Sequence, residues 1–84
     1  MEQVTIYGRP SCGFCVRAIA LCEFKKIPFV FIDIVQKGIS KADLAETIGK
    51  PVMTVPQILV GEEYIGGFEE FSRYIGQREA AMAR

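Results

Sequence analysis

Two cysteines stand three positions apart in the segment GRPSCGFCVRA, residues 8–18, as Cys12 and Cys15. The chain has one further cysteine and no histidine. Three kinds of site use such a pair: a structural disulfide, half of a metal site, or a dithiol that exchanges with other disulfides. The rest of the sequence has to distinguish among them.

The composition disfavours the first two kinds of site. A closed zinc site needs four ligands, and beyond the pair the chain offers only Cys22 and no histidine. An odd number of cysteines argues against a disulfide framework, and thiols stay reduced in the cytosol. Cys22 lies in an apolar helical segment, where we expect it to be a buried packing residue. A redox-active dithiol is therefore favoured.

The charge balance and the N-terminus limit the partners and the compartment. Ten basic and ten acidic residues cancel, so nothing favours binding to nucleic acid or to an anionic membrane. The start MEQVTIYG lacks the apolar segment of a secretory signal, and the most apolar stretch, IPFVFIDIV, is too short to span a bilayer. We expect one soluble cytoplasmic domain over residues 1–84 that acts as a monomer.

The first half of the chain is expected to form a strand, a helix and a second strand. VTIY (4–7) alternates and is β-branched, which predicts a strand. A helix should begin at Cys12 or Gly13 and continue through the apolar run that ends at Phe24. The continuous apolar run 28–34 is typical of a strand buried on both faces. This order predicts a parallel crossover between the two strands.

The second half adds a helix, a hairpin and a last helix. Ser40 and Asp43 have the spacing of a capping box for a helix that stops at Gly49. Two short strands flank a turn at 61–63, and the last helix follows Gly67. The predicted fold is α/β in the order β-α-β-α-β-β-α: a four-stranded mixed sheet flanked by three helices.

The expected start of the first helix gives the two thiols different roles. A helix N-terminus presents unpaired amides and the positive end of the dipole, which favour the thiolate, the reactive form of cysteine. Arg9 and Arg17 add positive charge on either side of the pair. Cys15 lies one turn further into the helix, so the dipole stabilises its thiolate less than that of Cys12. We therefore expect Cys12 to be the attacking nucleophile and Cys15 the resolving thiol.

Three segments together resemble the glutaredoxins: IYGRPSCGFCVRA, TVPQILV and YIGGFEEF, in the order and at the spacing of that family. The match extends from Val4 to Ile75 and is closest to the small bacterial and phage-type dithiol members. A thioredoxin proper fits less well, because no tryptophan precedes the dithiol and the intervening pair is not Gly-Pro. The resemblance implies a thioredoxin-like fold and glutathione-dependent reduction of protein disulfides and glutathione mixed disulfides. It also suggests ribonucleotide reductase as a protein substrate.

The resemblance further implies a glutathione and substrate site. Pro56 would be cis and would turn the backbone N–H and C=O of Val55 toward the cysteines. Arg9 would lie near the glycyl carboxylate, and free amides at the start of the last helix would hold the γ-glutamyl carboxylate. The residues so assigned are Arg9, Phe14, Thr54, Val55, Pro56, Gly67, Phe68, Glu69 and Glu70.

Two departures from the family pattern bear on this site. Glu69 and Glu70 stand where the family often has Thr-Asp; two acids can pair with the glutathione ammonium group but oppose its carboxylate. Gly13 and Phe14 stand where dithiol members often have Pro-Tyr, and the CGF segment is similar to that of relatives that hold iron–sulfur clusters. An alternative is therefore a glutathione-ligated [2Fe–2S] cluster bridging two protomers through Cys12. Cys15 disfavours it, because this thiol can close a disulfide with Cys12 instead.

Overall fold

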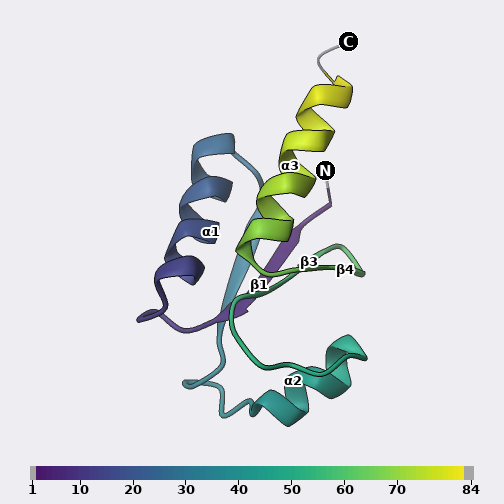
Figure 1. Ribbon diagram of the computed structural model, residues 1–84. Helices are drawn as coiled ribbons and strands as arrows, with labels where there is room; N and C mark the ends of the chain where they lie inside the picture. The colour runs from purple at the N-terminus through teal and green to yellow at the C-terminus, as the bar shows by residue number, and fades with distance from the viewer. Residues whose placement is uncertain (1, 83–84) are drawn as a thin grey trace.

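The computed structural model describes residues 2–82, which form a four-stranded sheet in the order β2-β1-β3-β4 with three helices (Figure 1). β1 is parallel to β2 and antiparallel to β3, and β3 is antiparallel to β4. The elements are β1 (Val4–Gly8), α1 (Gly13–Lys25), β2 (Phe29–Asp33), α2 (Lys41–Ile48), β3 (Gln57–Val60), β4 (Glu63–Gly66) and α3 (Phe68–Met82). The predicted order of elements and the mixed sheet are confirmed.

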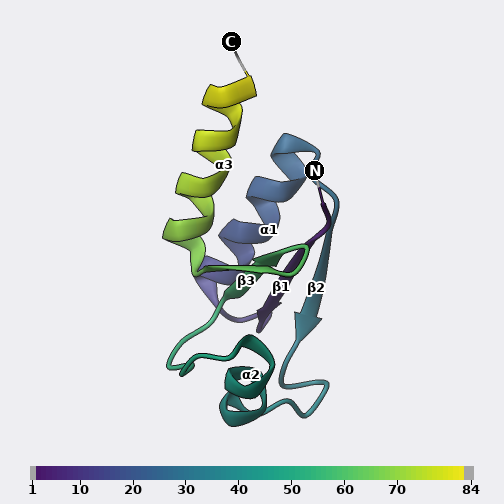
Figure 2. The same cartoon turned by 90° about the vertical axis from the view of Figure 1, so that its right-hand side faces the viewer.

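The main core lies between the sheet and the pair of helices α1 and α3, which run side by side on one face (Figures 1 and 2). Successive strand side chains point to opposite faces, so Val4 and Ile6 of β1 both enter this core. The buried members of the core are Val4, Ile6, Ala18, Cys22, Ile58, Val60, Phe71 and Ile75. Cys22 is fully buried, as expected of a packing residue.

A second, smaller core forms beneath the end of the sheet, where α2 lies (Figure 2). Ile34, Leu44 and Val52 are its buried members, and Tyr7 and Val55 pack against them. This core joins α2 to the stretch of chain that leads into β3. It therefore supports the backbone at Val55 from below.

The helix ends follow the local sequence. The Ser40 hydroxyl accepts a hydrogen bond from the Asp43 N–H at 3.0 Å, and the Asp43 carboxylate accepts one from the Ser40 N–H at 3.0 Å. The predicted capping box is thus present, and α2 ends at Gly49 with a φ of 84° that favours glycine. Cys12 is the N-cap of α1, which ends where Lys26 takes a left-handed conformation with φ 57°.

The expectation that β2 is buried on both faces is wrong. β2 is an edge strand with β1 as its sole neighbour in the sheet. Helix α1 covers one of its faces, and Val30, on the other, is 39% exposed. An apolar run indicates that a strand has hydrophobic side chains, but it does not specify how many layers cover it.

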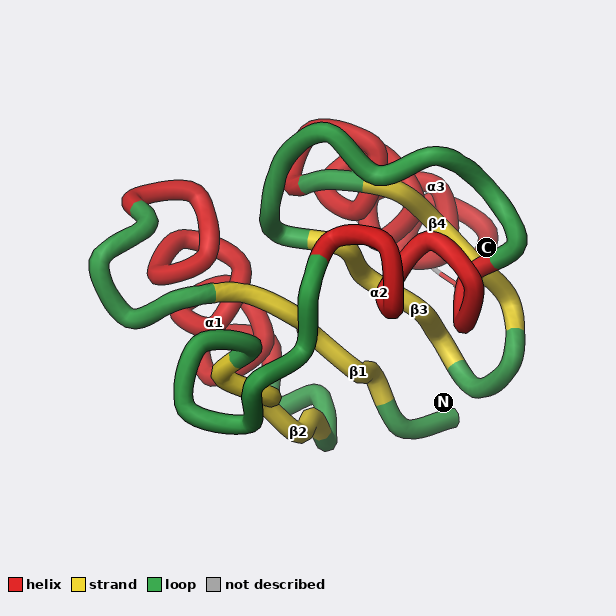
Figure 3. The backbone as a smooth tube through the Cα atoms, turned by 90° about the horizontal axis from the view of Figure 1, so that it is seen from below, coloured by secondary structure: helices red, strands yellow, loops and turns green. Residues whose placement is uncertain are grey.

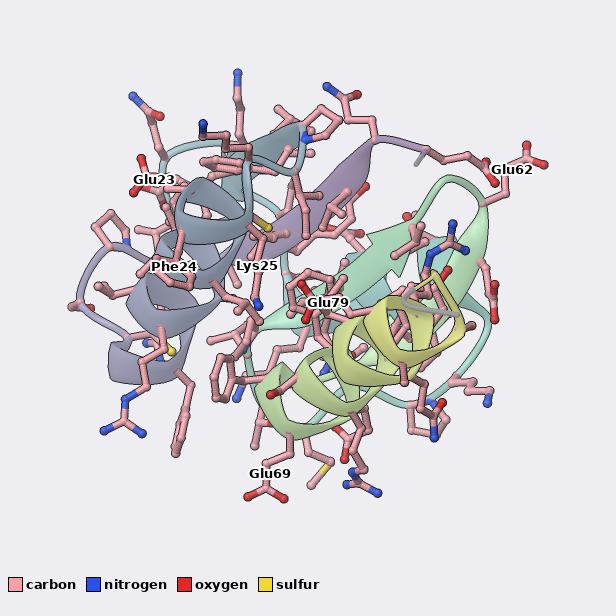
Figure 4. The ribbon with its side chains drawn as sticks, turned by 90° about the horizontal axis from the view of Figure 1, so that it is seen from above. Glu23, Phe24, Lys25, Glu62, Glu69 and Glu79 are labelled. Carbon is pink, nitrogen blue, oxygen red and sulfur yellow. The ribbon has the colours of Figure 1, made fainter. Side chains whose placement is uncertain are left out.

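At the far end of α1 from Cys12, an ion pair joins the two long helices. Lys25 Nζ and Glu79 Oε2 are 2.9 Å apart across the space between α1 and α3 (Figure 4). Both side chains are partly exposed, so the pair is worth about 0–1 kcal/mol. None of the helices within residues 2–82 is both long and apolar enough to cross a membrane.

Candidate active site

The start of α1, whose N-cap is Cys12, lies at the same end of the molecule as the loop that leads into β3 (Figure 3). The Cys12 side chain is half-buried, and its sulfur accepts a hydrogen bond from the Cys15 N–H at 3.3 Å. The same sulfur is 3.6 Å from the Val55 carbonyl oxygen, to which the thiol form donates. When Cys12 is ionised, the Cys15 N–H and the positive end of the α1 dipole both stabilise the sulfur's negative charge.

Cys15 has a different environment, although it follows within the first turn of α1. Its side chain is fully buried. Burial raises the pKa of the Cys15 thiol to about 12, and a hydrogen bond with the Cys12 sulfur adds to this effect. Cys15 therefore stays protonated while Cys12 is the accessible sulfur. The roles expected for the two residues, attacking nucleophile and resolving thiol, stay a prediction.

Gly8, which sequence reasoning placed in a loop, is the last residue of β1 and lies against Cys15. A Cβ atom at Gly8 would overlap the Cys15 sulfur and would come within 3.1 Å of the Cys15 Cβ and 3.3 Å of Phe31 Cε1. The absence of a side chain at Gly8 therefore makes room for the buried thiol. No sequence signal singles out this glycine among the eight in the chain.

The chain opposite Cys12 has the predicted backbone form: the Val55–Pro56 peptide bond is cis. The side chain of Gln57, which is 6% exposed, holds the backbone of the loop that precedes β3 by hydrogen bonds. Its Nε2 donates a hydrogen bond to the Thr54 carbonyl at 2.7 Å, and its Oε1 accepts one from the Tyr64 hydroxyl. Sequence reasoning missed Gln57, whose position in a strand gave no sign that its amide faces back toward the loop.

A hollow of about 280 Å³, here called the first hollow, brings together most of the residues assigned to glutathione binding. It is lined by Phe14, Thr54, Val55, Pro56, Gly67, Phe68, Glu69 and Glu70. Phe14 and Phe68 stack on one side with ring centroids 6.1 Å apart, and the Arg17 guanidinium lies 5.4 Å from the Phe14 ring. Phe68 is half-buried and also packs against the core, so it anchors α3 as well as lining the hollow.

Arg9 is the one assigned residue outside the first hollow. It lines a neighbouring space of about 340 Å³, here called the second hollow. The two hollows share Thr54 and Val55 as a common wall. Arg9 therefore lies on the opposite side of this wall from Glu69 and Glu70.

The start of α3 differs from the expectation that its amides are free. The Gly67 N–H donates a hydrogen bond to Glu70 Oε1 at 2.9 Å, so the helix's own acid occupies this donor. Gly66 has a φ of 130°, which favours glycine, and a Cβ atom at Gly67 would come within 3.2 Å of Glu70 Oε1. Glu69 instead points outward from the first turn (Figure 4). Across residues 2–82, no three His, Cys, Asp or Glu side chains are grouped to hold a metal ion.

Comparison with known proteins places these features in a family. The glutaredoxin family model matches residues 4–65. A glutaredoxin of Vibrio cholerae is 49% identical over 76 residues, covering 84% of this chain and 87% of its own. Glutaredoxin 1 of Escherichia coli is 41% identical over 78 residues, covering 87% of this chain and 92% of its own.

Solved structures agree with the sequence comparison. The reduced Escherichia coli glutaredoxin superposes with a TM-score of 0.80 at 40% identity, covering 90% of this chain and 95% of its own. A buckwheat glutaredoxin solved in complex with glutathione shares the fold, with a TM-score of 0.73 at 23% identity, covering 94% of this chain and 74% of its own. These findings support dithiol chemistry and give the [2Fe–2S] alternative no support. With its thioredoxin-like fold and its Cys12–Cys15 dithiol, this chain belongs to the glutaredoxin family of thiol–disulfide oxidoreductases.

Proposed function

We propose that this glutaredoxin uses glutathione to reduce glutathione mixed disulfides and protein disulfides. The observation that carries the proposal is the position of the half-buried Cys12 sulfur, 3.6 Å from the Val55 carbonyl in the wall of the first hollow. A disulfide bound along that wall presents its sulfur to the one accessible thiol of the pair.

With a glutathione mixed disulfide, Cys12 suffices for the chemistry. Its thiolate attacks the glutathione sulfur, forms a Cys12–glutathione disulfide and expels the substrate thiolate. A second glutathione thiolate then attacks the bound glutathione sulfur. This releases oxidised glutathione and regenerates the Cys12 thiolate, so the electron pair comes from glutathione.

With a protein disulfide, Cys15 completes the reaction. Cys12 forms a mixed disulfide with one substrate sulfur and releases the other as a thiolate. Cys15 then attacks the Cys12 sulfur, its proton passes to the departing substrate thiolate, and a Cys12–Cys15 disulfide closes. Burial keeps Cys15 protonated until this step, which prevents it from competing for the substrate. Two molecules of glutathione restore the dithiol.

The first hollow supplies complementary groups for glutathione. The Val55 backbone pairs with the cysteinyl main chain in the manner of an added strand. Glu69 faces the ammonium group, and Arg9 across the wall faces the glycyl carboxylate. Glu70 holds the Gly67 N–H, so the γ-glutamyl carboxylate either displaces it or uses the remaining amides of the first turn of α3. A buckwheat glutaredoxin that shares this fold has been solved in complex with glutathione.

We expect the protein to act as a monomer on protein disulfides in a reducing compartment such as the cytoplasm, where reduced glutathione is abundant. Ribonucleotide reductase is the protein substrate that the family resemblance suggests. Redox encounters bury little surface, so docking should be weak and transient.

Mass spectrometry of single-cysteine exchange tests the proposal. Cys15→Ser protein incubated with oxidised glutathione should gain one glutathionyl group, and fragmentation should place it on Cys12. The matched Cys12→Ser protein should gain none, because Cys15 and Cys22 are buried. Glutathione found on Cys15 or Cys22, or on no cysteine of the Cys15→Ser protein, would contradict the proposal.

A further inference from the structure

The second hollow contains more than glutathione binding requires. It lies between the turn after β2, the first residue of α2 and the stretch 53–55 that precedes the cis proline. Val35 and Met53 contribute apolar side chains to it that are 68% and 78% exposed. Large apolar side chains gathered on one exposed surface commonly mark a site of interaction, and methionine adapts its shape to varied partners.

The second hollow is also positively charged. Arg9 and Lys41 line it, and neither forms an ion pair with any residue of the described chain 2–82. The nearby acids are engaged by the backbone. The Asp33 carboxylate accepts hydrogen bonds from the N–H groups of Val35 and Gln36 at 3.0 and 3.1 Å, and Asp43 caps α2. Two cations beside an apolar surface therefore face the solvent.

The charge changes sign across the wall formed by Thr54 and Val55. Glu69 and Glu70 line the first hollow, whereas Arg9 and Lys41 line the second. A segment bound as an extended strand along Val55 advances about 3.3 Å per residue. A protein substrate that continues along this wall past the reacting cysteine thus reaches the Val35, Lys41 and Met53 side chains of the second hollow, which the tripeptide glutathione does not need.

We infer that the second hollow is a docking subsite for protein disulfide substrates and that it selects segments with an apolar and an acidic residue close to the reacting cysteine. The apolar side chain packs on Val35 and Met53, and the carboxylate faces Arg9 and Lys41. The inference rests on the proposed function, because it names the substrate class of the same dithiol. Opposite charge at such a surface mainly speeds encounter and excludes wrong partners.

Synthetic peptides with a single cysteine test this without glutathione. The cysteine is protected as a mixed disulfide with thionitrobenzoate, and Leu and Asp flank it on both sides so that either chain direction is sampled. The Cys12 thiolate of prereduced Cys15→Ser protein attacks the peptide sulfur. It forms a protein–peptide disulfide and releases coloured thionitrobenzoate, whose appearance gives the rate constant. Two comparison peptides carry Lys for Asp or Ser for Leu.

The peptide with Leu and Asp should react about three- to tenfold faster than the peptide with Lys, and the ratio should shrink as salt is added. Lys41→Glu should remove or reverse this preference for acid, and Met53→Asp should remove the preference for Leu over Ser. Lys37→Glu and Phe24→Asp are the matched controls, since both residues are exposed and outside the hollow. Both controls should keep both preferences. Ratios between peptides within one variant cancel differences in thiol reactivity.

The inference is overturned if Lys41→Glu keeps the wild-type preference for acid and Met53→Asp keeps the preference for Leu. It is also overturned if the controls lose these preferences as fully as the two variants. Turnover of a small glutathione mixed disulfide is measured on the same proteins, and Lys41→Glu and Met53→Asp should retain it. If the parent protein, with Cys15 intact, fails to turn over with glutathione while the peptide preferences persist, the proposed function fails and the docking subsite stands.

Discussion

The two thiols of the dithiol lie three residues apart in sequence but in opposite environments. Cys12 is half-buried at the N-cap of α1, and Cys15 is fully buried behind it. The sequence predicts this division, because the start of a helix after a loop fixes which cysteine meets the unpaired amides. Gly8 and Gln57 could not be predicted, since their importance arises from contacts across the fold with Cys15 and Thr54.

Gly8→Ala tests whether this glycine makes room for Cys15. The added Cβ would displace the Cys15 sulfur. We expect the reduction of a protein disulfide, which needs Cys15, to slow about tenfold, whereas turnover of a small glutathione mixed disulfide stays within about twofold. The strain should also lower the free energy of unfolding by about 1–3 kcal/mol. The double variant Gly8→Ala/Cys15→Ala should recover much of that loss, and strictly additive effects in this cycle would contradict the contact.

Cys22 should make the stability depend on pH in the alkaline range. Burial, followed by the neighbouring Glu23 charge, raises the pKa of Cys22 from its ordinary value of 9.0 to about 11. The unfolded chain loses this proton first, so the native state is destabilised as the pH rises from about 9 to about 11. The loss amounts to about 2–3 kcal/mol. Urea unfolding should show that Cys22→Ala lacks this part of the decline. If the free energy of unfolding falls equally with pH in the parent protein and in Cys22→Ala, the predicted contribution of Cys22 is contradicted.

At the scale of elements, the predicted boundaries are close to the observed ones where a local signal marks them. The capping box at Ser40 and the glycine at Gly49 delimit α2 as expected. The apolar run 28–34 correctly predicted the strand β2 but wrongly predicted that both of its faces are buried. The pattern of apolar residues shows which side chains are hydrophobic, but it does not show which strand lies at the edge of the sheet. The hydrogen bond from the Gly67 N–H to Glu70 could not be predicted from the sequence either, since it depends on the rotamer of the Glu70 side chain.

Gln57 connects β3 and β4 to the loop that faces Cys12, and its replacement should loosen substrate binding. Gln57→Leu leaves the Thr54 carbonyl and the Tyr64 hydroxyl without this partner. Gln57→Glu retains the acceptor for Tyr64 and loses only the donor to Thr54. We expect both to raise KM for a glutathione mixed disulfide about three- to tenfold, with kcat within about twofold. Unchanged KM in Gln57→Leu, with folding confirmed by circular dichroism, would refute a positioning role.

At the scale of the whole molecule, the packing brings three distant segments to one end. The starts of α1 and α3 and the loop before β3 meet there, with α2 below (Figures 1 and 3). The sequence predicts the order of elements, and the family resemblance implies eight residues that line the first hollow. The separation of Arg9 into a second hollow depends on how α2 packs against the loop, which no local pattern encodes.

The reduction potential is a property of the whole active-site end. We expect the Cys12–Cys15 couple to lie near −200 to −230 mV, the range of glutaredoxins, because glutathione is the proposed reductant. Equilibration of the protein against glutathione buffers, followed by thiol quantification, measures it. A value at or below about −270 mV would instead match a thioredoxin.

We expect a division of roles in which Cys12 alone performs glutathione-dependent exchange and Cys15 only resolves mixed disulfides with proteins. Steady-state reduction of a small glutathione mixed disulfide, with glutathione reductase coupling, tests it in three matched proteins. Cys12→Ser should be inactive, Cys15→Ser should retain much of the parent turnover, and Cys22→Ser should behave like the parent. Full activity in Cys12→Ser, or loss of activity in Cys15→Ser equal to that in Cys12→Ser, would contradict this division of roles.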